Sequence, residues 1–470
     1  MTQASVTHLR KKYRRHWWSW WLAIIIFLIP SNLFLNLNDN WGYVNGLRID
    51  YLIPKLYLVD LVIIPGWLIG GYQKRLLLIN WLKAHFNKLK WLVWWLVILA
   101  IRQRWSDQPQ ISYWWLGKLI LIGSFGLSLK LIKNSIHWSV ISWAILITLL
   151  FQSTLAIYQY HWQQSWSSYY FLGEPNLTNQ LGLAKSEWGS VEKILPYGTT
   201  PHPNILGGLI VVYWLVLWQS VKRTRLSTGK FSFMEKGFTY LSLPISAYAL
   251  WLTQSFSAWL AAIILLGSIA INFSKSKSHR NINRLLSSIL TGTNNQIARG
   301  FLNFFYRKKL NLGKINQSFL LILGWGLIFW ISPLIIDQLS SIVPDQPSFT
   351  RRTFLNHAAQ QMFIDHPIWG VGLNKVTAQL ASSPVRPEIV RFIQPSHHLG
   401  WLWLAETGIF GLLPIIIYWR LFTHFSLTKW WVLLPLLILD HYLLTQQVGW
   451  LMAVAVLALH PVGRFDTQQS

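Results

Sequence analysis

Residues 348–374 read SFTRRTFLNHAAQQMFIDHPIWGVGLN, and residues 395–411 read PSHHLGWLWLAETGIFG. Two further arginines, Arg386 and Arg391, lie between these segments, and long apolar segments precede and follow them. Basic side chains, histidines and turn-forming glycines in one stretch between apolar segments are typical of a binding or catalytic loop held by a scaffold. We therefore interpret the rest of the chain as a membrane scaffold that presents this stretch to a substrate.

Apolar residues recur within this stretch at the spacing of a helix. They are Leu355, Ala358, Ala359, Met362 and Phe363. This pattern predicts a helix whose apolar face lies on the membrane or on the other spans. Ser348 or Thr350 is expected to cap its start. Arg351 and Arg352 would then lie in the first turn, where guanidinium groups and unpaired backbone N–H groups face an anion together.

The composition indicates a polytopic membrane protein. Of the 470 residues, 53% are hydrophobic and 12% are charged, whereas soluble domains carry about 25% charged residues. The chain has no cysteine, which excludes disulfides, a thiol nucleophile and thiolate metal sites. Twelve apolar segments are expected to span the membrane, at about 17–35, 55–72, 89–101, 111–131, 136–158, 204–221, 237–253, 256–273, 317–336, 398–419, 430–446 and 447–460.

The net charge of +26 follows the membrane topology, which argues against a nucleic-acid partner. Most Lys and Arg residues fall in loops on one side of the proposed spans, so that side and both termini are expected in the cytoplasm. The N-terminal basic run should precede a retained first span and no cleaved signal peptide. We predict one transmembrane domain over residues 1–470, with extracytoplasmic loops at 160–203 and 337–397 and a basic cytoplasmic loop at 274–316.

Three histidines of residues 348–411 have both a structural and a chemical interpretation. His366 precedes Pro367 and Gly370, so it either hydrogen-bonds a tight turn or contacts a substrate. His397 and His398 open the tenth expected span. A neutral imidazole there would accept a proton from a hydroxyl group, or it would be an interfacial residue with no chemistry.

Two polar motifs outside this stretch are also candidates. His202 and Asn204 begin the sixth expected span, where they form either a loop-to-helix turn or a contact to a substrate headgroup. Asp440 and His441 lie inside the eleventh expected span. A charged residue there is costly, so the pair either holds the bundle together through an Asp–His or Asp–Arg contact or binds a substrate.

The external loops contain no D-x-D, H-E-x-x-H, Walker or G-x-S-x-G pattern, and their carboxylates are scattered. This disfavours a metal cluster and a paired-carboxylate hydrolase. Arginines and histidines without clustered carboxylates suit an anionic substrate that is activated with no metal and no cofactor.

Several motifs, in this order, resemble the O-antigen ligase and O-antigen polymerase superfamily of bacterial membrane proteins. They are Pro201-His202-Pro203-Asn204, Arg352, Asp365-His366-Pro367, Gly370-Val371-Gly372-Leu373-Asn374, His397, Gly408 and Gly411. The resemblance implies an all-α polytopic bundle of about twelve spans with a GT-C-type glycosyltransferase fold. A large extracytoplasmic loop would carry short helices, and the protein would lie in the bacterial cytoplasmic membrane.

The resemblance also implies the reaction and its partners. A glycan would pass from an undecaprenyl-diphosphate-linked donor to a hydroxyl of a glycan, lipid or protein acceptor, among membrane lipids and without a metal. The diphosphate-binding role carries over to Arg352, with Arg351 as its neighbour, and the role of the catalytic histidine carries over to His397.

Two positions depart from the family pattern. His398 stands where members usually carry Asn, Ser or Gln, so either the two adjacent imidazoles would share a proton or His398, and not His397, would be the catalytic histidine. Phe256 stands where members often carry an arginine, whose phosphate contact Arg386 or Arg391 would then supply. Two other functions remain open, namely a transporter or flippase for a polyprenyl-linked or other anionic substrate, and an inactive scaffold for glycan assembly.

Overall fold

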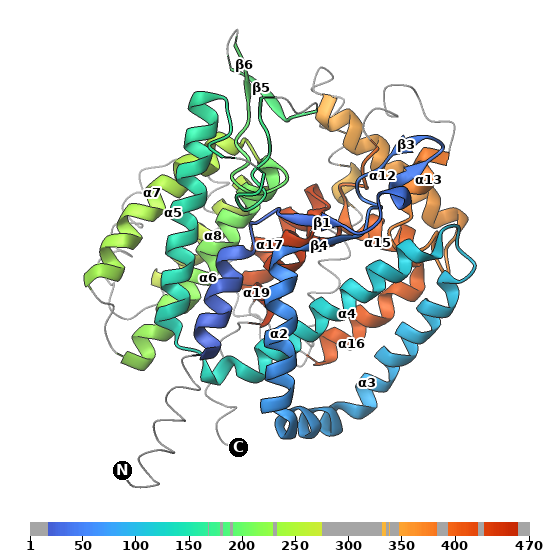
Figure 1. Ribbon diagram of the computed structural model, residues 1–470, viewed down its shortest axis with the longest axis horizontal. Helices are drawn as coiled ribbons and strands as arrows, with labels where there is room; N and C mark the ends of the chain where they lie inside the picture. The colour runs from blue at the N-terminus through green and yellow to red at the C-terminus, as the bar shows by residue number, and fades with distance from the viewer. Residues whose placement is uncertain are drawn as a thin grey trace, which may run out of the picture.

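The computed structural model describes residues 17–167, 169–178, 182–188, 191–228, 233–274, 331–334, 338, 347–382, 393–421 and 427–458. After a helix at Trp17–Leu28 come α2 (Leu58–Gln73), α3 (Arg75–Gln103), α4 (Pro109–Ile132), α5 (Trp138–Trp162), α6 (Pro203–Thr228), α7 (Phe233–Thr253) and α8 (Phe256–Ser274). The later helices are α12 (Pro347–Asp365), α13 (Val376–Ser382), α15 (Leu399–Thr407), α16 (Leu412–Leu421), α17 (Leu427–Leu439), α18 (Tyr442–Thr445) and α19 (Gln447–Ala458). The described chain is mostly helical, as the sequence predicts (Figure 1).

Helix α6 is packed on several sides by α5, α7, α8 and α19 (Figure 1). Its residues Leu206, Ile210 and Val211 are fully buried, because a helix that is apolar around its circumference has to be surrounded by other apolar elements. The core that α6 shares with its neighbours continues into Trp17–Leu28, α2 and α4. The N-terminal end of α6 is therefore held firmly, and it is this end that contributes to the functional site.

Three helices are long and apolar enough to cross a membrane, namely Pro109–Ser135, Trp138–Trp162 and Pro203–Arg223. The number rises to five if each of two bent helix pairs forms one span, and five shorter apolar helices also occur in the described residues. These helices support a membrane protein, but they do not establish twelve spans. Most of the expected span 317–336 and nearly all of the basic loop 274–316 lie outside the described residues.

Three short antiparallel strand pairs correct the all-α prediction. Strand β1 (Phe34–Asn36) pairs with β4 (Lys55–Tyr57), β2 (Tyr43–Val44) pairs with β3 (Leu47–Arg48), and β5 (Lys185–Trp188) pairs with β6 (Val191–Ile194). Asn45 and Gly46 join β2 to β3 with φ angles of 50° and 81°. Such angles are those of a two-residue hairpin turn, for which Asn-Gly is the favoured sequence.

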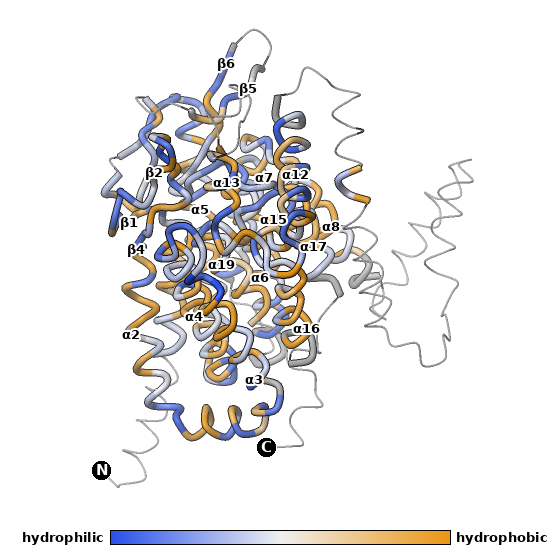
Figure 2. The backbone as a smooth tube through the Cα atoms, turned by 90° about the vertical axis from the view of Figure 1, so that its right-hand side faces the viewer, coloured by the Kyte–Doolittle hydropathy of each residue, from blue (hydrophilic) through white to orange (hydrophobic). Residues whose placement is uncertain are grey.

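In Figure 1 and Figure 2 the β5–β6 pair lies at the top of the molecule, and the β1–β4 pair lies near its middle. Figure 2 shows that hydrophilic residues are frequent around these strands, whereas hydrophobic residues prevail along α2, α6 and α16. The strand pairs are therefore a more polar part of the molecule, beside an apolar body made of helices.

Helix α12 has the apolar face that the sequence predicts, and this face packs on another helix. Leu355 and Ala359 are fully buried and contact Trp401, Leu402 and Ala405 of α15. The two helices therefore form a small core of their own, beside the main one. Packing of α12 on α15 brings the arginine pair and the His397 segment, which are more than 40 residues apart in sequence, into one region.

The expected start of this helix is wrong. Helix α12 begins at Pro347, so neither Ser348 nor Thr350 precedes it as a cap. Arg351 and Arg352 consequently lie in the second turn, beyond the first four residues whose backbone N–H groups are left unpaired in a helix. Their guanidinium groups, and not the helix terminus, are the groups available to an anion.

Two of the expected spans are interrupted. The expected span 398–419 consists of two helices, α15 and an apolar helix at Ile409–Ile417, and these meet at an angle of 115°. The bend lies at Gly408, which has a φ of 62°. The span 430–446 ends as a regular helix at Leu439, and Asp440 and His441 separate α17 from α18. Each interruption leaves polar groups at helix ends in the interior of the protein.

Candidate functional site

His202 caps the N-terminus of α6. Its Nδ1 accepts a hydrogen bond of 3.1 Å from the backbone N–H of Asn204, and Pro203 occupies the first helical position, where its lack of an N–H costs little. Because Nδ1 is the acceptor, the neutral ring carries its proton on Nε2. Burial, together with the positive charge of Arg352, lowers the pKa of His202 to about 4. The ring is therefore neutral at physiological pH.

His398 caps α15 in the same manner. Its Nδ1 accepts a hydrogen bond of 3.2 Å from the backbone N–H of Trp401, and its Nε2 lies 3.0 Å from Oγ of Ser332. Both ring nitrogens are thus engaged in holding the start of the helix, and the residue is buried. Of the two adjacent histidines that the sequence singles out, His398 has the structural contacts.

His397 has a different environment. Its ring lies edge-on to the ring of His441, with 4.9 Å between the centroids. Its Nδ1 is buried and has no hydrogen-bond partner among the described residues. Burial and the neighbouring positive or ionisable groups, first His441 and then Arg352, hold the pKa of His397 well below its usual value. His397 is thus a neutral imidazole whose Nδ1 is not engaged within the described protein.

Asp440 and His441 occupy the break between α17 and α18. The buried Asp440 carboxylate accepts hydrogen bonds from Nδ2 of Asn204, at 3.1 Å, and from the hydroxyl of Ser257. His441 is held by Thr445, whose Oγ1 lies 2.6 Å from Nδ1 of the ring. Asp440 therefore connects the starts of α6 and α8, and Asn204 contacts a carboxylate inside the protein.

Arg352 brings these parts together. It interacts electrostatically with His202, His397, Asp440 and His441, and we call these five residues the central cluster. Arg351 interacts in the same way with Arg352 and with His397. Because such interactions fall off steeply with distance, the cluster gathers one cation, one carboxylate and three imidazoles from four separate parts of the chain, and Arg351 adds a second cation beside it.

A polar contact sets the position of Arg352 relative to His397. Asn356 lies one turn after Arg352 on α12, and its Oδ1 accepts a hydrogen bond of 2.8 Å from the hydroxyl of Ser396. The same hydroxyl accepts a hydrogen bond of 3.2 Å from the backbone N–H of His398. Residues four apart on a helix share one face, so this contact holds the arginine face of α12 against the segment that carries His397.

Among the described residues, no group of three or more His, Cys, Asp or Glu side chains is arranged to hold a metal ion. Residues 241–416 of the chain match a family model that is described as O-antigen ligase. Over this segment, the chain is similar to the O-antigen ligase family. No curated protein matches the chain.

The O-antigen ligase segment supplies only part of the central cluster. Arg351, Arg352 and His397 lie inside it. His202, Asp440 and His441 lie outside it. Asp440 and His441 contact Ser257 and His397 of the segment, and His202 interacts electrostatically with its Arg352. The site is therefore assembled between the family segment and the helices on either side of it.

A second family motif, the turn after α12, has a structural role in the O-antigen ligase segment. The backbone N–H groups of Val371 and Gly372 donate to the carbonyl groups of Ala405 and Glu406, at 2.8 and 3.0 Å. A Cβ at Gly370 would lie 2.4 Å from the backbone of Glu406. These bonds satisfy carbonyl groups that a helix end leaves unpaired, so the turn closes the C-terminus of α15. The motif therefore forms the tight turn that its glycines predict.

His366 lies away from the central cluster. It follows the end of α12 and is exposed. Fourteen residues separate it from Arg352, which along a helix corresponds to about 20 Å. The sequence prediction that His366 contacts the substrate therefore receives no support from its position.

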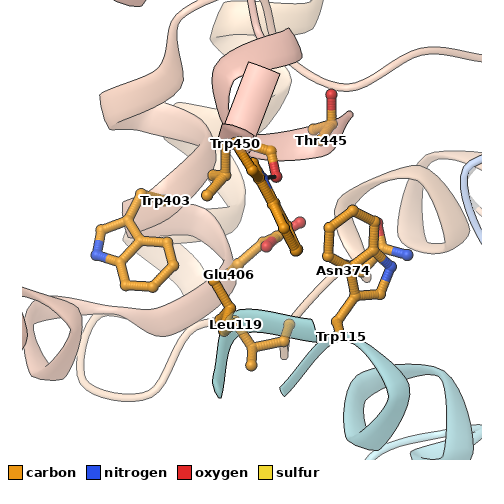
Figure 3. A pocket seen from close by; sticks show the side chains of 9 residues that line it. Trp115, Leu119, Asn374, Trp403, Glu406, Thr445 and Trp450 are labelled. Atoms are coloured by element: carbon orange, nitrogen blue, oxygen red, sulfur yellow. Dashed lines mark hydrogen bonds between the residues drawn. The ribbon is translucent and has the colours of Figure 1, made fainter. Parts of the chain in front are cut away.

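Glu406 is a buried carboxyl group beyond the same turn. Figure 3 shows it among the rings of Trp115, Trp403 and Trp450. The backbone of Asn374 hydrogen-bonds it, and Nδ2 of Asn374 donates to the carbonyl group of Tyr51 at 2.8 Å. The turn thus ties α15 to the loop before β4, whose Tyr51 contacts His441 with 5.6 Å between ring centroids.

Three further candidates can be placed only in part. Arg386 and Arg391 lie outside the described residues. Phe256, at the position where the family often has an arginine, is 53% exposed, and its neighbour Ser257 instead contacts Asp440. Phe256 itself therefore does not take the place of the arginine that family members often carry at this position.

Proposed function

We propose that this protein transfers a glycan from an undecaprenyl-diphosphate-linked donor to an acceptor hydroxyl at the outer face of the bacterial cytoplasmic membrane. The single observation that carries the proposal is the convergence of Arg351 and Arg352 with His397 in one partly buried site. The family match supports ligase or polymerase chemistry.

The arginine pair is assigned to the leaving group. When the bond between the sugar C1 and the diphosphate oxygen breaks, the bond electrons leave with undecaprenyl diphosphate, which gains negative charge. Guanidinium groups stay protonated and match phosphate oxygens in geometry, and a pre-placed positive charge stabilises such a developing anion strongly in a partly buried site. Two adjacent arginines on one helix suit the two phosphates of the donor.

His397 is assigned to the acceptor. Its neutral ring accepts the proton of the acceptor hydroxyl as the hydroxyl oxygen forms the new bond to C1, which contributes about 100- to 10,000-fold in typical general-base catalysis. The charges balance, because the proton remains on the imidazole and the negative charge departs with the diphosphate. Asp440 interacts electrostatically with Arg352 and offsets part of the positive charge of the arginine pair.

The proposed topology extends the observed helices. Twelve spans with both termini in the cytoplasm would place residues 160–203 and 337–397 outside, as the distribution of basic residues predicts. A GT-C-type arrangement belongs to the same proposal. The acceptor is a glycan, a lipid or a protein, since ligases and polymerases of this kind differ in the acceptor.

The test uses the full-length protein in detergent, with a lipid-linked glycan donor and an acceptor fraction from a strain that lacks the gene. We expect Arg352→Ala and His397→Ala each to lower kcat by at least about 100-fold. Arg352→Lys should retain part of the activity, because lysine keeps the charge but loses the forked geometry. The new glycosidic product is measured by gel mobility and mass spectrometry, and thermal unfolding confirms that each variant is folded.

Matched controls are available at exposed positions. Arg104→Ala and His161→Ala remove the same side-chain types at exposed positions and should leave kcat within about twofold of the parent, as expected for surface changes. Full transfer activity in both Arg352→Ala and His397→Ala would refute the assignment. A parent protein that moves the donor across vesicle membranes but forms no glycosidic bond would instead be a flippase.

A further inference from the structure

A cavity of about 470 Å³ lies between α4, α19, the β1–β4 strand pair and the loops around residues 173 and 201. It is lined by residues from the N-terminal half of the chain and from the segment 445–450. Ligand-binding cavities of soluble and membrane proteins are commonly about 300–1,000 Å³ in size, so this one is large enough for a small ligand.

The cavity borders the central cluster on the side of His202 and His441. Thr445 lines the cavity and holds Nδ1 of His441. Tyr51 lines it and contacts the ring of His441, and Pro201 lines it next to His202. Arg351 and Arg352 are not among its described lining residues. The imidazoles themselves are also not among the described lining residues, so a ligand in the cavity would be separated from His441 by side chains such as Thr445 and Tyr51, and it would not occupy the place of the arginine pair.

The lining combines flat aromatic rings with amide groups. Trp114, Trp115 and Tyr57 provide rings, and Asn32 and Gln446 provide amides. An aromatic ring covers the apolar C–H face of a pyranose, while amide groups both donate to and accept from hydroxyl groups. This pattern of rings and amides fits a saccharide.

The charges of the cavity favour a neutral ligand. Lys118 is paired with Asp60, and Lys55 interacts with Asp50, so each lysine of the lining has a carboxylate in reach. An anionic group would therefore find no uncompensated pair of cations here, in contrast to the Arg351 and Arg352 site. The cavity suits the sugar part of a substrate and not its diphosphate.

We propose that this cavity binds the acceptor glycan through its uncharged sugar residues and holds the glycan next to the central cluster. The inference rests on the proposed function, because it assigns a place to the second substrate. The lining residues named here all lie outside residues 241–416. Acceptor choice is thus encoded in parts of the chain that the family segment does not include.

The first test measures binding without turnover. The chain has no cysteine, so Asn32→Cys gives a single reporter in the cavity, and Asn40→Cys gives an exposed control in the same loop region. Each variant is labelled with a hydrophilic maleimide in the presence of one of two ligands. The first is delipidated oligosaccharide from the envelope glycolipids of a deletion strain, and the second is undecaprenyl diphosphate without sugar. We expect the oligosaccharide to slow labelling of Asn32→Cys at least fivefold and the control not at all.

The second test measures kinetics. Trp114→Ala should raise the acceptor KM about fivefold or more and leave the donor KM unchanged, since one ring removed from a ligand site commonly costs about 1 kcal/mol or more. Tyr113→Ala, the neighbouring exposed position on α4, should leave both values unchanged.

The two tests separate this inference from the proposed function. Protection of Asn32→Cys by the oligosaccharide in a protein that makes no glycosidic bond would support the cavity assignment and refute the transferase. Two outcomes would overturn the cavity assignment and leave the transferase intact. One is normal transfer in a protein whose Asn32→Cys is not protected by the oligosaccharide. The other is a Trp114→Ala variant in which the donor KM changes and the acceptor KM does not. Protection by undecaprenyl diphosphate alone would assign the cavity to the donor and would also overturn it.

Discussion

At the scale of single residues, the ionisation of His397 determines how the reaction should respond to acid. Burial and its cationic neighbours hold the pKa of His397 well below its usual 6.5. A general base works while it is neutral, and a lowered pKa keeps it neutral as the pH falls through 6.5. The base is lost only once the pH drops below the lowered value.

We therefore expect kcat/KM to stay within about twofold between pH 8 and pH 6, since kcat/KM reports groups of the free enzyme. Transfer is measured at subsaturating donor in buffers of matched ionic strength. A decline centred at or above pH 6.5 that is absent in His397→Gln would contradict the environment described for His397.

Also at the residue scale, Arg352 and His397 could be selected from the sequence through the family resemblance. The structure brings these two residues into one region, as their proposed shared role requires. The residues that position them were missed. Asn356 and Ser396 act through a contact between positions 40 residues apart, and neither belongs to a recognisable motif. His441 was noted only as part of a costly polar pair, because its contact with His397 depends on how α15 and α17 are packed.

At the scale of elements, the turn 366–372 packs against the end of α15, and the backbone conformation favours glycine at two positions of this contact. Gly370 has a φ of 63° and Gly408 has a φ of 62°. A Cβ at Gly370 would also meet the backbone of α15 at 2.4 Å, where no side-chain rotation relieves the contact.

Gly370→Ala should destabilise the protein by at least about 1–3 kcal/mol, the cost of an unfavourable backbone conformation alone. The midpoint of thermal unfolding in detergent, followed by tryptophan fluorescence, should fall by several degrees. Gly71→Ala, at a helical position with no atom within 4 Å of the new Cβ, should not lower it. An unchanged midpoint in Gly370→Ala would show that the contact is not under this constraint.

Helices α2, α4, α5, α7 and α8 were readable from the sequence to within about four residues, because each has a long apolar pattern. Helix α3 begins well before the expected span 89–101, and α13 was not predicted. The strand pairs were also not predicted, since each has two to four residues per strand and too little pattern to detect. One signal was present in the sequence, namely Asn45-Gly46 at the β2–β3 turn. The interruptions at Gly408 and Asp440 were also missed, because both lie within continuous apolar stretches.

At the scale of the whole molecule, a buried ion pair connects three helices. Lys118 of α4 is paired with Asp60 of α2. Nε2 of Gln447 in α19 donates to the same carboxylate at 2.6 Å. Lys118 also lines the cavity of about 470 Å³, so the pair lies at the cavity wall, where the two charges compensate each other.

Lys118→Met should destabilise the protein by about 3 kcal/mol or more, because it leaves a buried carboxylate without its cation. The double variant Lys118→Met with Asp60→Asn should recover part of that loss. Lys185→Met, which removes the exposed pair with Glu192, serves as the control and should change the unfolding midpoint little. A double variant less stable than Lys118→Met would argue against a compensating pair.

Histidines serve as the N-terminal caps of both α6 and α15, and these helices border the site from two directions. In each cap the imidazole nitrogen offers a lone pair to a backbone N–H group. Acid that protonates the ring converts this acceptor into a donor that faces another donor. Strong acidification would therefore loosen the framework of the active centre as well as its chemistry, so recovery of activity after an acid pulse would depend on both helix starts re-forming.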